Sequence, residues 1–364
     1  MESTSSSYTF SNLTSGATFY VKVYVKDSNN RESSVSATSI KTKLPTIKDV
    51  CSSGTNLASC IKTFGDKGSS ISNIYHHDAS LANGAGDNSY RYAGASDQVN
   101  NYVCFGSTKT PCPTDNLYRI IGVFGDKVKL IKSDYATSAL LGTDGDYKQA
   151  YTATGHHSFY YKGNNLANIA GYTWNYKYDT SINNGMGSNT WSTSLLNKTN
   201  LNTNFITNIG ADWAAKIDMT TWKVGGNTFA NIAKQPAKTA YQNEIVSPVT
   251  TNTTDNVIEY RAKVGLMYAS DYGFAAAPSA WTTNLWKYDG NGIINVNWMY
   301  MGLYEWTISR DADGAFRVFN VNYTGGLSNS SAYYVHAVRP VFSLSSSITY
   351  LSGDGTKTEP IRIN

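Results

Sequence analysis

Residues 19–25 alternate apolar side chains with polar or amphipathic ones. A period of two is typical of a half-buried strand. The polar residues 28–30 supply a turn, and a second strand is predicted at 34–41. The N-terminal segment is therefore predicted to fold as a β-hairpin. The apolar positions of its first strand are Phe19, Val21, Val23 and Val25.

A second hairpin is predicted where two apolar-rich runs, 117–124 and 127–132, flank the dipeptide Gly125-Asp126. This dipeptide suits a tight two-residue turn. Residues 191–217 repeat large apolar side chains with Asn and Gly interruptions, which predicts two or three short helices. Further strands are expected at 264–268, 298–308, 315–321 and 335–344.

The order of these elements predicts an α+β fold with an irregular sheet and long loops. Residues 1–43 are expected to form a partial β-sandwich segment, and 44–50, with Pro45, a linker. Residues 51–364 are expected to form the main domain. Its first part, 51–116, is rich in Gly, Ser and Asn and is expected to be irregular.

The N-terminal segment resembles the last three strands of a fibronectin type III module. Leu13, Gly16 and Phe19 match the family's leucine, turn glycine and aromatic corner in spacing, although the family usually has a tyrosine at the corner. The resemblance is confined to residues 8–42, whereas such a sandwich needs roughly 100 residues. We therefore expect the segment to be part of a module cut from a longer surface protein.

Four motifs of the main domain carry a second resemblance. They begin at Trp191 (WSTSLLN), Val264 (VGLMYASDY), Tyr304 (YEWTISR) and Val338 (VRPVFSL). Their order and spacing resemble a domain family of unknown function in Firmicutes surface proteins. That family is similar to the C-type-lectin-like fold of formylglycine-generating enzymes and of the variable proteins of diversity-generating retroelements. The resemblance implies a C-type-lectin-like irregular sheet that displays its loops to a ligand.

Two departures limit what this resemblance implies about function. Formylglycine-generating enzymes use a cysteine pair near the C-terminus, whereas no cysteine follows Cys112 here. Calcium-dependent lectins use a Glu/Gln-Pro-Asn/Asp motif beside Trp-Asn-Asp, and neither occurs in this chain. The resemblance therefore implies neither copper-dependent oxidation nor calcium-dependent sugar binding, and we expect no cofactor and no metal site.

The cysteines form two close pairs along the chain, Cys51 with Cys60 and Cys104 with Cys112. Each pair brackets a loop rich in Ser, Thr and Gly, which predicts two local disulfides and an oxidising compartment. The alternative is a four-thiolate zinc site. Zinc usually has about two to four residues between the ligands of a pair, and both loops here are longer.

Charged residues make up only 15 % of the 364 positions, and the net charge is +4. The usual charged share is roughly 25 %. The chain has 27 tyrosines and 30 glycines but no run of Lys or Arg, so a nucleic-acid partner is not expected. No apolar run approaches the roughly 20 residues that span a bilayer. We therefore expect a surface of uncharged hydrogen-bonding groups and no membrane insertion.

Adjacent histidines occur twice, at 76–77 and at 156–157. Metal ligands on a helix are spaced about three or four residues apart, so loop histidines are the favoured interpretation.

The Asp-rich stretches 143–146 and 311–314 begin like calcium loops. Counting from Asp311, however, the place of the bidentate glutamate is taken by Asn322. Turns are therefore favoured over weak ion sites.

Arg339 precedes a proline in an otherwise apolar closing strand. We expect it to be a conformational anchor that bonds loop carbonyls, because its guanidinium offers five donors in a rigid plane. A functional arginine is the alternative.

The segment 284–336 concentrates Tyr, Asn, Ser, Gly and His, the composition of an antibody paratope. It lies between the second and last framework strands of the resemblance, where the lectin-like fold displays its ligand face. In retroelement-diversified proteins the same stretch carries varied positions, and the residues here are compatible with that. A fixed surface of an Asn- and Tyr-rich protein is the alternative. The predicted ligand-binding residues are Asn295, Asn297, Trp298, Tyr300, Phe319, Asn320, Asn322, Tyr323, Tyr333, Tyr334 and His336.

These features predict a non-enzymatic extracellular binding or adhesion protein on a bacterial cell surface or a phage particle. Its expected partner is a protein or glycan on another cell. One alternative is a secreted carbohydrate-active domain, for which Asp271, Glu305 and Asp311 are the acids near the motifs. Another is a structural subunit of an appendage or virion. No catalytic residue is predicted.

Overall fold

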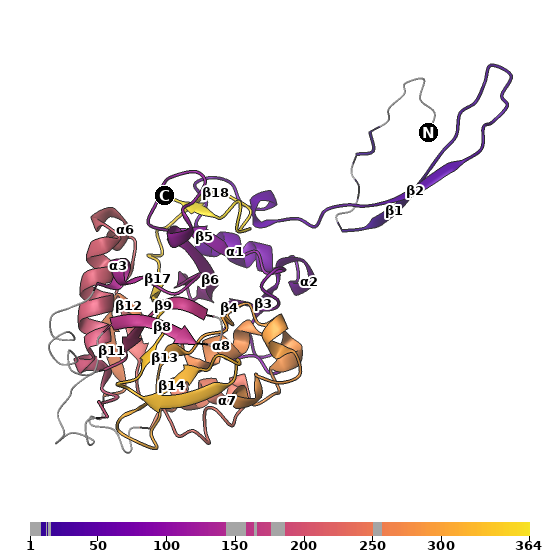
Figure 1. The fold of residues 1–364 in the computed structure, drawn as a ribbon. Helices are drawn as coiled ribbons and strands as arrows, with labels where there is room; N and C mark the ends of the chain where they lie inside the picture. The colour runs from indigo at the N-terminus through magenta and orange to yellow at the C-terminus, as the bar shows by residue number, and fades with distance from the viewer. Residues whose placement is uncertain are drawn as a thin grey trace.

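The computed structural model describes residues 9–11, 13, 16–142, 158–163, 166–175, 186–249 and 257–364. Helices and strands are both present, and the strands form open sheets. This content is compatible with the predicted α+β class (Figure 1).

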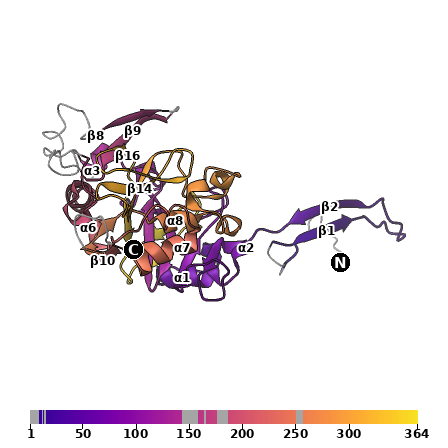
Figure 2. The same ribbon diagram turned by 90° about the horizontal axis from the view of Figure 1, so that it is seen from below.

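The predicted N-terminal hairpin is confirmed. Strands β1 (Thr18–Val23) and β2 (Ser36–Lys41) pair antiparallel, with Phe19 opposite Ile40. The hairpin extends away from the rest of the chain in both ribbon views (Figures 1 and 2). Phe19 and Val21 are half-buried, whereas Val23, Val25 and Ile40 are exposed and Tyr20 is 82 % exposed.

Residues 51–116 contain more regular structure than expected. Helix α1 buries Leu57, Ile61 and Phe64, which recur at a helical spacing, and the side chain of Asn56 accepts a hydrogen bond from the Ser59 amide as the N-cap. The prediction of an irregular region was therefore wrong for these residues. The elements from residue 47 to residue 116 are η1 (Ile47–Asp49), α1 (Leu57–Gly65), α2 (Ser69–Ser72), β3 (Ile74–His76), β4 (Tyr90–Tyr92), β5 (Tyr102–Cys104) and η2 (Thr114–Asn116).

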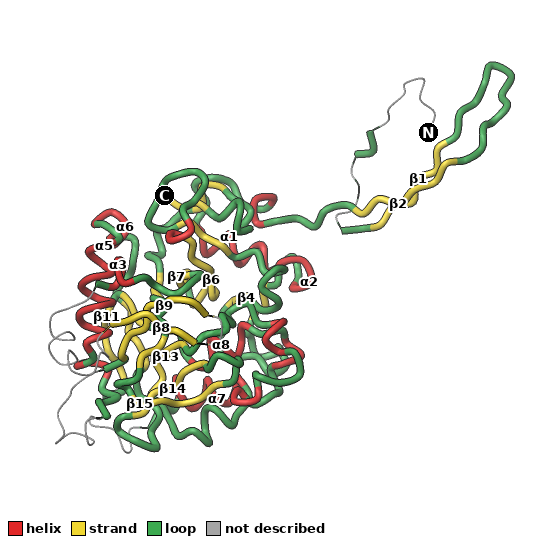
Figure 3. Tube along the Cα trace, in the orientation of Figure 1, coloured by secondary structure: helices red, strands yellow, loops and turns green. Residues whose placement is uncertain are grey.

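The largest sheet lies at the centre of the main domain, as the strand colours of Figure 3 show. Its strand order is β12-β17-β7-β6-β4-β3, with β5 beside β6. The hairpin of β6 (Leu117–Phe124) and β7 (Lys127–Lys132) has the predicted bounds. Gly125 in its turn has a φ of +64°, which glycine adopts at little cost. Strands β12 (Val264–Gly265) and β17 (Val341–Ser343) complete one side of the sheet.

The predicted short helices at 191–217 are confirmed. The strand expected at 264–268 was only partly right, because it ends at Gly265 and a fully buried helix, α8, begins at Ala269. Helix α8 packs against α7, β4, β13 and β14. The helical segments after residue 132 are α3 (Ser138–Leu141), η4 (Trp191–Thr193), η5 (Leu196–Phe205), α5 (Ile206–Asn208), α6 (Ala211–Ala215), α7 (Ala237–Tyr241), η6 (Gln242–Val246), α8 (Ala269–Ala275), η7 (Pro278–Ala280), η8 (Leu285–Lys287) and η9 (Ile293–Val296).

Smaller sheets surround the central one. The strand expected at 298–308 begins only at Glu305, since residues 297–304 form turns and loop. The strand expected at 335–344 is split into two short pieces. The remaining strands are β8 (Ser158–Gly163) with β9 (Leu166–Thr173) and β16 (Val335–His336); β10 (Thr220–Lys223) with β11 (Glu259–Ala262); β13 (Glu305–Arg310), β14 (Arg317–Val321) and β15 (Leu327–Ser331) in one sheet; and β18 (Tyr350–Ser352) with β19 (Arg362–Ile363).

Tryptophan supplies the largest side chains of the core. Trp306 Nε1 donates to the carbonyl of Tyr172 at 2.8 Å, and Trp222 Nε1 donates to that of Ala262 at 3.1 Å. A buried indole needs such a partner for its N–H. Much of the aromatic content therefore serves the interior. The fully buried tryptophans are Trp174, Trp191, Trp222, Trp281 and Trp306.

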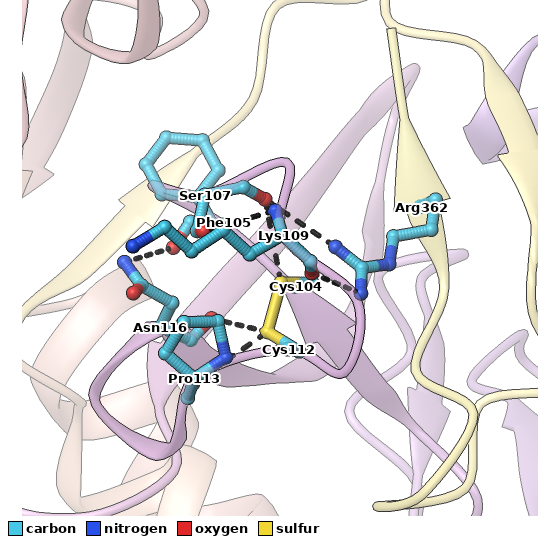
Figure 4. Close-up of a disulfide and its surroundings, with 8 residues drawn as sticks. All are labelled: Cys104, Phe105, Ser107, Lys109, Cys112, Pro113, Asn116 and Arg362. Carbon is cyan, nitrogen blue, oxygen red and sulfur yellow. Dashed lines mark hydrogen bonds between the residues drawn. A yellow bond between two sulfur atoms is a disulfide. The ribbon is translucent and has the colours of Figure 1, made fainter.

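Both predicted disulfides are present, Cys51–Cys60 and Cys104–Cys112. All four thiols are consumed, so the zinc alternative is wrong. Figure 4 shows how the second disulfide closes a loop that Arg362 of β19 reaches: Nη2 donates to the Lys109 carbonyl at 2.7 Å. The loop is thus tied to the C-terminal strand as well as to itself.

Two disulfides fit a secreted or extracellular protein. Within the described residues, no helix is long and apolar enough to cross a bilayer.

Candidate functional site

Five tyrosines of the predicted binding segment and its border are exposed or half-buried, and we call them the tyrosine face. Tyr323 is 38 % exposed and Tyr334 is 46 % exposed. The other members are partly covered. The tyrosine face consists of Tyr300, Tyr304, Tyr323, Tyr333 and Tyr334.

The structure brings three of these tyrosines together from two segments, Tyr300 and Tyr304 from the loop before β13 and Tyr323 from the turn after β14. The Tyr300 hydroxyl donates to the backbone carbonyl of Tyr323 at 2.7 Å. The rings of Tyr304 and Tyr323 have their centroids 5.4 Å apart at an angle of 55°. Such tilted pairs add packing energy beyond the area they bury. This cluster is therefore ordered by its own contacts.

Tyr333 and Tyr334 form a second pair, with ring centroids 4.7 Å apart. The two-residue strand β16 follows this pair and ends at His336. The His336 ring stacks on Tyr304 at 5.2 Å. His336 therefore links the two tyrosine groups. It follows the Tyr333–Tyr334 pair in the chain, and its ring contacts Tyr304 of the first cluster and the buried Trp306.

The turn that presents Tyr323 is built by Asn322. Its Oδ1 accepts hydrogen bonds from the Thr324 amide at 2.9 Å and the Gly326 amide at 3.1 Å, the local bonding by which asparagine favours turns. Gly325 has a φ of +101°, and a Cβ there would meet Ile294 of η9 at 2.4 Å. Asn322 is thus a scaffold residue. Asn295, the next residue of η9, is exposed.

Five of the eleven predicted ligand-binding residues are buried, so direct contact with a ligand was the wrong role for them in this conformation. Strand β14 lies between β13 and β15 and is buried from Val318 onward. Its side chains are therefore covered on both faces of the strand. The buried residues are Asn297, Trp298, Phe319, Asn320 and His336.

The side-chain nitrogens of Trp298, Asn297 and Asn320 each have an internal partner. Trp298 Nε1 donates to the carbonyl of Tyr92 at 2.8 Å. Asn297 Nδ2 donates to the carbonyl of Tyr272 at 3.1 Å, and Asn320 Nδ2 donates to Ser330 Oγ at 2.9 Å. They hold loops and strands together beneath the surface, which is a positioning role.

Tyr304 was not predicted as a site residue. It directly precedes Glu305, the first residue of β13, and belongs to the YEWTISR motif, which was assigned to the framework. A large aromatic at the edge of a strand, next to a Tyr-rich turn, was the signal that could have identified it.

The tyrosine face is uncharged at neutral pH. Burial raises the pKa of Tyr300 above its ordinary value, and the hydrogen bond with Tyr334 raises the pKa of Tyr333. Burial lowers the pKa of His336 to about 4, so the imidazole is neutral too. Its Nδ1 lies 2.8 Å from the Val335 carbonyl oxygen, and Nε2 has no hydrogen-bond partner in the described part of the chain.

Arg339 anchors the segment from below, as predicted. Its Nε and Nη2 donate to the two carboxylate oxygens of Glu305 at 2.6 and 2.8 Å, and Nη2 also donates to the Met299 carbonyl at 2.7 Å. All these groups are buried. A bidentate Arg–carboxylate pair fixes geometry strongly. It joins the closing strand, β13 and the loop before Tyr300.

The alternative acids are engaged in internal contacts. Glu305 bonds Arg339, and Asp271 accepts a hydrogen bond from Lys129. Asp311 is buried, and its Oδ1 accepts a hydrogen bond from the Asp313 amide at 3.0 Å. This bond shapes the turn that was favoured there over an ion site.

The two histidines at 76–77 lie in different environments. His76 stacks on Tyr90 at 4.2 Å near the surface, whereas His77 is buried and its Nδ1 accepts from the Ala85 amide at 3.0 Å. The exposed-loop interpretation was therefore wrong for His77. Across the described ranges, no group of three or more His, Cys, Asp or Glu residues could hold a metal ion. The pair at 156–157 and the stretch 143–146 lie outside the described residues.

The chain matches no protein-family model, no curated protein and no solved structure.

Proposed function

We propose that this chain is a non-enzymatic extracellular binding protein that meets a protein or glycan on another cell with its tyrosine face. The observation that carries the proposal is that Tyr300 and Tyr304, from the loop before β13, meet Tyr323, from the turn after β14, and that this cluster is ordered by its own contacts. Preordered aromatic rings lose little conformational entropy when they bind, which favours affinity.

The chemistry of the face sets the expected mode of binding. Tyrosine rings supply contact area, and their hydroxyls and the exposed Asn295 supply uncharged hydrogen bonds. The face is neutral, so electrostatic steering contributes little and binding should depend weakly on salt.

The resemblance to C-type-lectin-like domains supports the same proposal. The four motifs lie in the framework: Trp191 and Trp306 are fully buried, and Arg339 ties the closing strand to β13. Tyr323, Tyr333 and Tyr334 lie between the last two motifs, Tyr300 precedes the third motif, and Tyr304 begins it. We propose a C-type-lectin-like domain on a fibronectin-like segment, displayed on a bacterial cell or a phage particle.

Retroelement diversification is part of the proposal and makes a sharp prediction. Adenine-specific differences between a template repeat and this gene should concentrate at exposed positions such as Tyr323 and Tyr334. They should spare buried ones such as Trp298 and Phe319, because substitution there would disturb the core. Sequencing the flanking DNA for a reverse transcriptase and a near-repeat of codons 284–337 checks this.

The direct test is binding of the labelled chain to arrayed surface glycans and to intact bacterial cells. Tyr323→Ala and Tyr334→Ala should each weaken binding, since both residues are exposed members of the face. Tyr20→Ala is the matched control, because Tyr20 is also exposed but lies on the N-terminal hairpin. Equal loss in all three variants would argue against the face.

A further inference from the structure

A buried lysine and a buried aspartate, neither of which belongs to the tyrosine face, touch in the interior of the chain. Lys129 lies on β7 and Asp271 on α8, 142 positions apart in the chain. Lys129 Nζ donates a hydrogen bond to Asp271 Oδ2. The two side chains are only 8 % and 1 % exposed.

Aromatic rings surround the amine. The Lys129 nitrogen lies 4.6 Å from the ring centroid of Tyr268, 5.3 Å from that of Phe124 and 5.8 Å from that of Trp222. Burial lowers the pKa of the Lys129 ammonium, and the nearby Arg91 lowers it further, while Asp271 opposes both. Desolvation of this kind makes the neutral, nucleophilic amine accessible.

The carboxyl group of Asp271 is held for attack. Its Oδ2 also accepts a hydrogen bond from the Tyr268 amide at 3.1 Å. Its Oδ1 lies 3.5 Å from Arg91 Nη1, an atom that has no hydrogen-bond partner among the described residues. Arg91 is itself 2 % exposed and bonds Asp87 and Ser89 through its other nitrogens. A fixed cation beside Oδ1 would stabilise negative charge that develops there.

We propose that Lys129 and Asp271 condense into an intramolecular amide bond. One proton passes from Nζ to Oδ2, which leaves a neutral amine and a neutral acid. Nζ then attacks Cγ, and the negative charge on Oδ1 faces Arg91. A second Nζ proton joins Oδ2, the Cγ–Oδ2 bond breaks and water leaves. The third proton remains on the amide nitrogen, so no oxidant, cofactor or partner is needed.

The surroundings suit this condensation. A cavity of about 200 Å³ is lined by both reacting residues, Arg91 and Tyr268, and it can receive the released water. Glu244 is fully buried near α8, and its Oε1 accepts a hydrogen bond from the Ser270 amide at 2.7 Å. Burial raises the pKa of Glu244. Its neutral form would place no second negative charge beside the Asp271 carboxyl.

Two other lysine–carboxylate pairs serve as matched comparisons. Lys127 pairs with Asp218 and Lys223 pairs with Glu259, but these side chains are between 33 % and 48 % exposed. Water stabilises the ions there, so both are expected to remain ordinary ion pairs.

The test is the intact mass of the full chain after reduction and unfolding. The wild type should be one water lighter than its sequence requires. Lys129→Arg, which keeps the charge but cannot form the amide, and Asp271→Ala should both have the full sequence mass. Lys223→Arg should retain the loss. A tryptic digest should contain one branched peptide that joins the segments around Lys129 and Asp271.

A wild-type chain at full sequence mass would overturn the proposal, and that measurement does not depend on whether a variant folds. Loss of water that persists in Lys129→Arg, or that maps elsewhere in the digest, would overturn it as well. The inference is independent of the proposed binding function, so either can fail alone.

Discussion

Trp298 and Tyr300 are two positions apart in one aromatic, Asn-rich stretch, but they occupy opposite environments. Trp298 is 2 % exposed, donates to the Tyr92 carbonyl and lies under the Arg119 guanidinium at 4.7 Å. Tyr300 is half-buried and holds the turn that presents Tyr323. The same division separates Phe319 in β14 from Tyr323 in the turn that follows. The Tyr- and Asn-rich composition is shared by the whole segment 284–336. The geometry of its strands and turns determines which of its side chains are exposed and can contact a ligand.

The largest expected effect is a loss of stability when a buried aromatic residue of the segment is replaced. Phe319→Ala should lower the free energy of unfolding by about 3–5 kcal/mol, because it leaves a cavity in a fully buried site. Tyr323→Ala should change it by less than about 0.5 kcal/mol. Denaturant titration of both variants measures the difference. Equal effects would show that the division between buried and exposed aromatics is wrong.

Arg339→Met should cost about 3–5 kcal/mol, because it leaves the Glu305 carboxylate buried without its partner. The double variant Arg339→Met with Glu305→Gln should recover much of the loss, since no unpaired charge then remains. Thermal and denaturant unfolding of the three proteins check this. A double variant no more stable than the single one would argue against a charge effect.

His336 should make the fold acid-sensitive. Its pKa is lowered from the usual 6.5 to about 4 in the folded state. Its neutral form therefore contributes stability that is complete above pH 6.5 and is lost as the pH falls towards 4. The loss amounts to about 3 kcal/mol at most. His336→Gln should flatten the pH dependence of unfolding in this window. An unchanged slope would assign the acid sensitivity to other groups.

Local patterns predicted several parts of the fold. The Gly125-Asp126 turn with its flanking apolar runs identified β6 and β7. The short separation between the cysteines of each pair identified both disulfides. Alternation of apolar and polar residues identified β1, in which Phe19 and Val21 are half-buried and Tyr20 is exposed. In each case the signal lies within about ten neighbouring residues, where turn geometry and side-chain period act directly.

Tertiary contacts decided the rest. Helix α8 has no exposed face, because all seven of its residues are buried, so periodicity could not distinguish it from a buried strand. The strand expected from residue 298 starts late because Asn297 bonds the Tyr272 carbonyl and the Met299 amide, which holds a turn there. In the candidate site, Asn320 looked like a paratope residue, but it is buried and its Nδ2 donates to Ser330 Oγ of β15. Its burial depends on a neighbour that was not predicted.

The central claim is that the tyrosine face binds its ligand through uncharged aromatic contacts. The most direct measurement is the affinity of wild type, Tyr323→Ala, Tyr334→Ala and Tyr20→Ala for intact bacterial cells and arrayed glycans, at low and high salt. We expect each face variant to lose at least about 2 kcal/mol of binding free energy, roughly 30-fold in Kd, as for an aromatic hot spot. Tyr20→Ala should bind like wild type, and salt should have little effect. Face variants that bind like wild type, or binding that collapses as salt rises, would contradict the account.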